Sequence, residues 1–302
     1  MTTSGSVTKQ QPHPKYRPDI DGLRAVAVLA VVCFHAFPKV FAGGFIGVDI
    51  FFIISGFLIS GILLTSLKRD TFSFKEFYTR RILRIFPALI VVLTACYFIG
   101  WVVLLPEEFQ QLGKHMVGGA GSISNLFFWQ EAGYFDNSAE TKPLLHLWSL
   151  GVEEQFYIVW PCLLLLAWKR RINALKMAGC IIAISFAVNI YTVQTDAVQS
   201  FYSPIMRFWE LLLGGLLAYF QQHMIHVEQR IRQGIDRLLS RFTARRLPVV
   251  NPITLQNSLS VLGIFFIVFA ILFIDKKMLF PGWWALLPAL GAYLIISAGP
   301  SP

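Results

Sequence analysis

A histidine lies in the first long apolar run of the chain, and an aspartate lies in the second. His35 falls in RAVAVLAVVCFHAFP and Asp49 in GGFIGVDIFFIISGFLISG. On a helix, Arg24 and His35 share a face about 16 Å apart along the axis, so His35 lies beyond the membrane midplane, toward the outside. Asp49 lies about one turn inside the outer surface, at a depth comparable to that of His35. A carboxylate beside an imidazole favours general-base chemistry, so we predict that both residues are catalytic. The structural alternative is a core histidine bonded to a backbone carbonyl.

Three arginines precede the third apolar run, in FYTRRILRIFPA. Arg81 and Arg84 share a helix face at i, i+3, and Arg80 and Arg84 share one at i, i+4. Planar guanidinium groups bind phosphates through paired hydrogen bonds, so the cluster could hold a polyphosphate cofactor. Simple anchoring at the membrane surface is the alternative.

A further group of ionisable residues enters the fourth apolar run, PLLHLWSLGVEEQFYIVWP. On a helix, His146, Glu153 and Trp160 lie on one stripe, while Glu154 points about 100° away. Adjacent carboxylates in an apolar helix need partners, and FYSPIMRFWELLLGG offers Arg207 and Glu210 at i, i+3. A buried structural Arg–Glu network is the alternative for these residues.

Composition indicates the elements that position these residues. The 302 residues are 55% hydrophobic, 15% aromatic and only 14% charged, which exceeds the apolar content of ordinary soluble chains. Spanning a bilayer takes about 20 apolar residues in a helix. We therefore predict an all-α polytopic membrane helix bundle with about eight spans. The predicted spans are 23–41, 45–67, 85–105, 147–168, 177–193, 201–220, 257–274 and 281–298.

Positive charge predicts the topology. If the Gly-rich segment 112–130 does not cross, 20 Lys and Arg residues lie inside and 5 outside; if it crosses, the split becomes 13 and 12. The positive-inside rule therefore favours a re-entrant or interfacial helix at 112–130 and a cytoplasmic N-terminus. The same bias accounts for the net charge of +9, so no nucleic-acid partner is expected.

The chain is expected to form one membrane domain over residues 20–302, after a polar cytoplasmic tail at 1–19. The basic loop 221–247 suits an amphipathic helix on the anionic lipids of the inner leaflet. The four cysteines lie in predicted spans without metal-type spacing, so we expect no metal site and no disulfide framework.

Five blocks of the sequence together resemble the acyltransferase-3 family of bacterial membrane O-acyltransferases. They occur in family order between residues 16 and 218, and a fainter similarity continues through FPGWWALLPALGAYLIISAG. The opening and closing blocks are similar to the subgroup that acetylates O-antigen or related surface polysaccharides, often with an added extracytoplasmic SGNH-type hydrolase-like domain. The five blocks are RPDIDGLRAVAVLAVVCFHAFP, GGFIGVDIFFIISGFLIS, FYTRRILRIFPAL, LLHLWSLGVEEQFYIVWP and YSPIMRFWELLLGGLLA.

The resemblance implies that an acyl group, usually acetyl from acetyl-CoA, moves from the cytosol to a hydroxyl of an extracytoplasmic glycan, which can be lipid-linked. The location would be the bacterial cytoplasmic membrane. The family normally continues with further spans, so the resemblance implies that the C-terminal part is missing here. The family's functional positions match His35 and Asp49; Arg17, Asp21 and Arg24; Arg80, Arg81 and Arg84; and His146, Trp148, Ser149, Glu153 and Glu154.

These observations combine into one mechanistic hypothesis. The cofactor-binding residues are Arg80, Arg81 and Arg84, which hold the phosphates of coenzyme A, together with Arg17 and Arg24. His35, oriented by Asp49, is the base for the acceptor hydroxyl. His146, Glu153 and Arg207 shape the outer site, and both direct transfer and a covalent acyl-histidine intermediate stay open. The alternatives are a proton-coupled secondary transporter, with His35 and Glu153 as its proton relay, and a non-catalytic subunit of a glycan-assembly complex.

Overall fold

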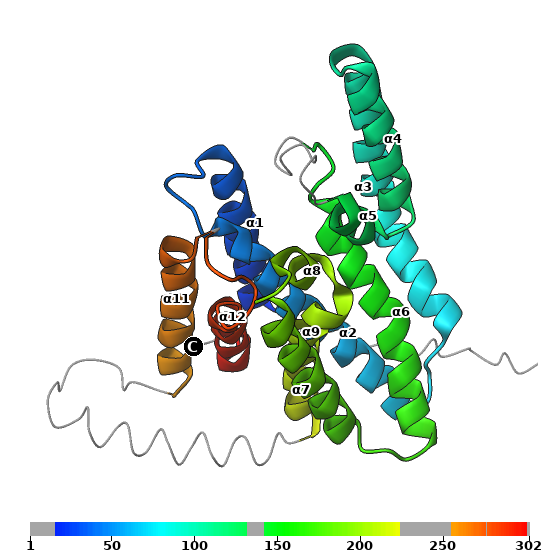
Figure 1. Ribbon diagram of the computed structural model, residues 1–302. Coiled ribbons are helices and arrows are strands. Elements are labelled where there is room, and N and C mark those ends of the chain that lie inside the picture. The colour runs from blue at the N-terminus through cyan, green and yellow to red at the C-terminus, as the bar shows by residue number, and fades with distance from the viewer. Residues whose placement is uncertain (1–15, 132–141, 224–254, 276, 301–302) are drawn as a thin grey trace, which may run out of the picture.

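The computed structural model describes residues 16–131, 142–223, 255–275 and 277–300. Within these ranges the chain forms helices and no strand, as predicted for an all-α bundle (Figure 1). The predicted amphipathic loop 221–247 and most of the predicted tail 1–19 lie outside the described residues. The helices are α1 (Pro18–Ala36), η1 (Gly44–Ile46), α2 (Gly47–Lys68), α3 (Phe74–Val103), α4 (Pro106–Ala120), α5 (Ser124–Glu131), α6 (Leu147–Lys169), α7 (Ala174–Thr192), α8 (Ala197–Tyr202), α9 (Pro204–His223), α11 (Leu255–Phe273) and α12 (Leu286–Ala298).

Helix α2 forms the centre of the bundle. It packs most extensively against α9 and also contacts α1, α6 and α12. Gly56 and Gly214 make the close approach to α9 possible: a Cβ at Gly56 would collide with the Leu211 carbonyl oxygen, and one at Gly214 with that of Ile53. Small residues at such crossings let transmembrane helices pack backbone to backbone.

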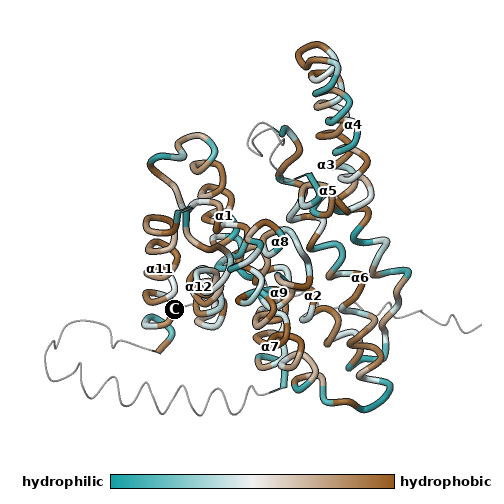
Figure 2. The backbone as a smooth tube through the Cα atoms, in the orientation of Figure 1, coloured by the Kyte–Doolittle hydropathy of each residue, from teal (hydrophilic) through white to brown (hydrophobic). Residues whose placement is uncertain are grey.

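Within the described ranges, five helices are long and apolar enough to cross a membrane: α2 together with η1, α3, α6, α7 and α11. Their burial differs with their place in the bundle. The most apolar stretch of the central span is 61% buried, but that of α3 is only 11% buried and those of α7 and α11 are each 17% buried. The tube is largely brown along α7 and α11 (Figure 2), which suits helices that expose apolar side chains to lipid.

Three predicted spans differ from the helices that the structure shows. The span predicted at 23–41 ends as a helix at Ala36, just before Pro38, and its first turns carry charged residues. The span predicted at 201–220 is interrupted at Ser203, because α8 ends there and Pro204 begins α9. The span predicted at 281–298 is helical only from Leu286, and α12 is 13 residues long.

The Gly-rich segment 112–130 does not form one continuous helix. It contributes the end of α4 and most of α5, and these helices are separated by a turn in which Ser122 has a φ of 56°. Neither helix meets the length of a spanning helix. In Figure 1, α4 lies beside the end of α3, away from the centre of the bundle. The segment therefore contains no helix long enough to span a membrane among the described residues, while its re-entrant or interfacial placement stays a prediction.

Candidate active site

One pocket between the central helices contains both predicted histidines. It has a volume of about 640 Å³ and is lined by residues of α1, α2, α6, α8 and the loop before α12. We call it the histidine pocket and define it by His35, His146, Trp148, Ser149, Phe201 and Phe280. Most of its remaining lining residues are valine or aromatic side chains, so its walls are apolar apart from two imidazoles and a few hydroxyls.

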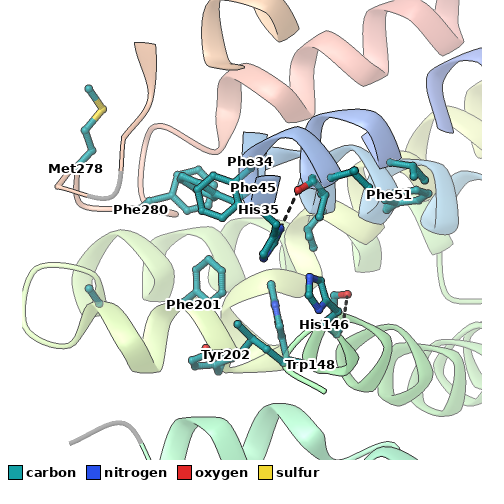
Figure 3. Close-up of a pocket in the computed structure, with 17 residues that line it drawn as sticks. Phe34, His35, Phe45, Phe51, His146, Trp148, Phe201, Tyr202, Met278 and Phe280 are labelled. Carbon is teal, nitrogen blue, oxygen red and sulfur yellow. Dashed lines mark hydrogen bonds between the residues drawn. The ribbon is translucent and has the colours of Figure 1, made fainter. Parts of the chain in front are cut away.

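His35 and His146 lie close together in this pocket, and Figure 3 shows their rings next to each other. Their ring centroids are 4.5 Å apart with the planes tilted by 49°. The Nδ1 atom of His35 lies 2.8 Å from the Val31 carbonyl oxygen. Because a carbonyl oxygen only accepts hydrogen bonds, Nδ1 carries the hydrogen, and Nε2 of the neutral ring is then the acceptor. This tautomer is the one that a general base with a reactive Nε2 requires.

His146 stands at the N-terminus of α6, as the residue before Leu147. Burial, and after it the positive charge that His35 can carry nearby, lowers the pKa of His146 below its usual value of 6.5. The positive end of the α6 dipole also disfavours a charged imidazole there. Ser149, one turn further along, donates a hydrogen bond from Oγ to the His146 carbonyl oxygen at 3.2 Å. Burial and the α6 dipole both favour the neutral form of the His146 imidazole.

Asp49 does not pair with His35, so the predicted His–Asp pairing is wrong. Its side chain is fully buried, and Arg207 donates from Nη2 to Asp49 Oδ1 at 2.8 Å. Val48, the preceding residue, lines the histidine pocket. Successive residues of a helix are about 100° apart, so Asp49 faces α9 where Val48 faces the pocket. The sequence did not predict the direction in which the Asp49 side chain points.

Arg207 forms a buried ionic triad with Asp49 and Glu210. Its Nη1 lies 3.0 Å from Glu210 Oε1, and all three side chains are at most 1% exposed. This is the buried structural network that the sequence offered as the alternative, with Asp49 as an added member. Arg207 and Glu210 were also candidate partners for Glu153 and Glu154, but no ion pair joins Arg207 to either glutamate in the described part of the chain.

An aromatic cage surrounds the guanidinium of Arg207. Its Cζ lies 5.3 Å from the ring centroid of Phe52, 5.9 Å from Trp148, 5.8 Å from Phe201 and 5.8 Å from Phe280. Trp148, Phe201 and Phe280 also line the histidine pocket. Arg207 thus lies behind the pocket wall and does not line the pocket, and its contribution is to hold the aromatic side chains that do.

A second pocket, of about 190 Å³, contains three of the predicted arginines. We call it the arginine pocket and define it by Arg24, Arg81, Arg84, Glu153 and Tyr157. The Cζ of Arg81 lies 4.9 Å from the Tyr157 ring centroid, and the Tyr157 hydroxyl donates to Glu153 Oε2 at 3.0 Å. Glu153 therefore belongs with the arginines, which corrects the prediction that it shapes the site around His146. The two residues do share a stripe of α6, but seven residues separate them by about 10 Å.

Two other predicted cofactor ligands lie outside the arginine pocket. Arg80 is exposed and forms an ion pair with Glu76 at 2.9 Å. Arg17 pairs with Asp19 at 2.7 Å and donates to the Ile296 carbonyl oxygen at 3.0 Å, so it ties the start of α1 to α12. Glu154 is half-buried, and its Oε1 has no hydrogen-bond partner among the described residues.

Sequence reasoning did not select Tyr157, although a signal was available. Tyr157 follows Glu153 by four residues, so a helix places both on one face.

A second group that the sequence analysis did not select lies at the end of α5, where Glu131 accepts hydrogen bonds from Lys114 at 2.7 Å, from His115 at 2.7 Å and from Lys142 at 3.0 Å. These groups come from three separate segments, and nothing in their spacing predicts that they meet.

Comparison with known proteins places the chain in a family. The family described as "Acyltransferase domain" matches residues 17–296. An uncharacterized protein of Haemophilus influenzae is 38% identical over 200 residues, which cover 64% of this chain and 81% of that protein. The peptidoglycan O-acetyltransferase OatA of Listeria monocytogenes is 38% identical over 213 residues, and the putative peptidoglycan O-acetyltransferase YrhL of Bacillus subtilis is 38% identical over 220 residues.

The two named relatives are much longer than the part that matches. Each match covers 68% of this chain, but only 34% of the Listeria protein and 33% of the Bacillus protein. No solved structure matches the chain significantly. The family match spans nearly all described helices and both pockets. The chain therefore belongs to the acyltransferase-3 family and carries the membrane domain of an O-acetyltransferase.

Proposed function

We propose that the chain transfers an acetyl group from cytosolic acetyl-CoA to a hydroxyl group of an extracytoplasmic glycan, such as O-antigen or another surface polysaccharide. The observation that carries the proposal is the arrangement of two chemically different pockets along the same helices α1, α2 and α6. Peptidoglycan, the glycan in the names of two relatives, is a further acceptor of the same chemical class.

The arginine pocket would bind the donor. Arg24, Arg81 and Arg84 supply guanidinium groups that suit the phosphates of coenzyme A, since each can donate paired hydrogen bonds to phosphate oxygens. The neighbouring Glu153 already accepts a hydrogen bond from Tyr157, so its carboxylate has a donor of its own. The positive-inside rule places these arginines at the cytosolic face, with the N-terminus in the cytosol and the chain in the bacterial cytoplasmic membrane.

The histidine pocket would bind the acceptor hydroxyl and the thioester. The Nε2 of His35 accepts the hydroxyl proton while the hydroxyl oxygen attacks the carbonyl carbon of the thioester. The carbon–sulfur bond breaks, and the proton passes from His35 to the departing thiolate. The ring centroid of His146 lies 4.5 Å from that of His35, so His146 orients these groups or carries the acetyl group in a two-step relay. The apolar walls exclude water, which would otherwise hydrolyse the thioester.

The partners in this proposal follow from the assignment of the donor to the arginine pocket and of the acceptor to the histidine pocket. They are acyl-CoA on the cytosolic side, membrane lipids around the exposed faces of α3, α7 and α11, and a glycan acceptor, which can be lipid-linked, on the other side. The longer relatives leave room for an additional domain, and an SGNH-type hydrolase-like domain is the partner we expect from the family resemblance.

The proposal is tested with inside-out membrane vesicles that enclose lipid-linked O-antigen and receive labelled acetyl-CoA from outside. We expect label in the glycan with the native chain and a decrease of about 10²- to 10⁴-fold with His35→Ala, because a positioned general base contributes about that factor. Arg80→Ala, at a residue outside both pockets, is the matched control for expression and insertion. Full labelling with His35→Ala would exclude the assigned base. Proton-driven solute flux without consumption of acetyl-CoA would favour the transporter alternative.

A further inference from the structure

One face of α2 lines the two pockets in succession. Val48 lines the histidine pocket, whereas Ser55 and Leu58 line the arginine pocket. Between them lies Phe51, which lines both. The spacing of these four residues, at intervals of three, four and three, keeps them on one helix face. Among the described residues, Phe51 is the side chain that the two pockets share.

The other two walls change pocket within about one helical turn. On α1, Arg24 lines the arginine pocket and Val28, four residues later, lines the histidine pocket. On α6, Ser149 lines the histidine pocket and Glu153, four residues later, lines the arginine pocket. Four residues advance about 6 Å along a helix. The two pockets are therefore separated along all three helices by about one turn, at the level of Phe51.

We infer that the two pockets are halves of one passage and that the side chain of Phe51 is the partition between them. Phe51 is half-buried on α2, and Figure 3 shows it at one end of the histidine pocket, on the far side of His35 from Met278 and Phe280. A phenylalanine changes its position by rotation between staggered χ1 wells, without a change in the backbone. The passage therefore opens by the movement of one side chain.

The inference rests on the proposed function and adds a specificity-determining residue to it. The thioester end of the donor must pass Phe51 to reach His35, whereas the phosphates stay at the arginines. A closed partition keeps water and the acceptor out of the arginine pocket when no donor is bound. The size of the opening also limits which acyl groups reach the histidines, because a longer chain needs a wider displacement of the ring.

Thiol accessibility tests the partition without any need for acyl transfer. The probe is Ser55→Cys, in a background where Cys33, Cys96, Cys162 and Cys180 are replaced by alanine, and the reagent is a charged, membrane-impermeant methanethiosulfonate. Val48→Cys in the same background identifies the side of the vesicle from which the histidine pocket is reached. From that side, we expect Ser55→Cys to react at least tenfold faster when Phe51→Ala is added.

The matched control is Phe45→Ala, because Phe45 lines the histidine pocket but not the arginine pocket. It enlarges the first pocket and leaves the partition in place, so Ser55→Cys is expected to stay slow. Phe51→Leu, which keeps a shorter apolar side chain, is expected to give an intermediate rate and serves if Phe51→Ala does not fold. Equal rates with and without Phe51, or a slow rate in both folded Phe51 variants, would overturn the inference.

Acyl-donor selectivity gives a second readout in the full-length protein. With Phe51→Ala, we expect butyryl-CoA to be used at least fivefold better relative to acetyl-CoA, and more acetyl-CoA to be hydrolysed without acceptor. The two experiments separate the two claims. If Ser55→Cys reacts faster when Phe51→Ala is added, but the protein with native Ser55 and Phe51 transfers no acetyl group, the result would support the passage and reject the proposed function. Transfer with unchanged selectivity and unchanged thiol rates would support the function and reject the partition.

Discussion

The histidine pocket and the arginine pocket share three helices but differ in almost every chemical property. The histidine pocket is the larger, at about 640 Å³ against 190 Å³, and its polar side chains are few. The arginine pocket has three guanidinium groups, a carboxylate and a phenol in its smaller lining. The difference indicates a division of work along one bundle: Arg24 of the arginine pocket lies about 16 Å along α1 from His35, the residue proposed to accept the hydroxyl proton.

A second difference concerns how arginine is used in the two places. In the arginine pocket, Arg81 and Arg84 are open to a ligand. Behind the histidine pocket, Arg207 is fully enclosed by Asp49, Glu210 and aromatic rings. The first kind of arginine is suited to bind phosphate, and the second is suited to fix the pocket wall. Substitution of each kind should therefore affect a different measurement.

Among the substitutions that test this difference, Arg207→Ala is expected to have the largest effect, and that effect should be on folding stability. Removal of the guanidinium leaves two buried carboxylates without their partner, and breaking a buried ion pair in this way costs about 3–5 kcal/mol. Thermal unfolding in detergent would measure the loss. The triple variant Arg207→Met, Asp49→Asn and Glu210→Gln removes the charges together and should recover part of it. An unchanged unfolding temperature for Arg207→Ala would show that the triad does not support the wall.

Arg81→Ala is expected to have a smaller effect, and the effect should be on donor binding. Loss of one charged hydrogen bond costs about 1.5–3 kcal/mol, so the KM for acetyl-CoA should rise about tenfold to a hundredfold. Arg80→Ala is the matched control, since Arg80 lies next to Arg81 but pairs with Glu76 outside the pocket. We expect Arg80→Ala to change the KM by less than about twofold. Equal effects of the two substitutions would place the donor elsewhere on α3.

The fold class could be predicted from the sequence, and so could the spacing of residues along a single helix. Hydrophobic runs set which segments become helices, and counting along a helix sets how far Arg24, His35 and Glu153 lie along its axis. The rotation of a helix about its axis could not be predicted, because an apolar span has no polar face to fix it. Asp49 shows the consequence: its neighbour Val48 lines the same pocket as His35, but Asp49 itself pairs with Arg207 on α9.

Contacts between distant segments were the other part that sequence reasoning could not supply. The pairing of Arg207 with Glu210 follows from their i, i+3 spacing, and it is observed. The pairing of Arg207 with Asp49 joins α9 to α2 across 158 residues and depends on the close crossing at Gly56 and Gly214. Similarly, spacing alone could not predict that Arg81 lines the arginine pocket whereas the adjacent Arg80 does not.

The residues of the cluster around Glu131 line neither the histidine pocket nor the arginine pocket, so the cluster provides a region for contrast. Its carboxylate accepts hydrogen bonds from Lys114 and His115 on α4 and from Lys142 before α6. Burial alone would raise the pKa of Glu131, but these three donors lower it from 4.5 to about 2. A cluster that joins three segments outside the pockets should affect stability and leave donor binding unchanged.

Glu131→Gln is therefore expected to have the smallest effect, confined to stability and dependent on pH. Because the folded-state pKa is lower than the unfolded value, the carboxylate stabilises the folded chain fully above about pH 4.5 and loses that contribution as the pH falls toward 2. At pH 7 we expect Glu131→Gln to cost about 2 kcal/mol, the contribution typical of hydrogen bonds to a charged group. Between pH 4.5 and 2 the difference from the native chain should shrink, as measured by thermal unfolding across that range, while the KM for acetyl-CoA at pH 7 stays unchanged. A difference that persists at pH 2, or a shift in that KM, would mean that the cluster acts through one of the pockets and would remove the contrast between them.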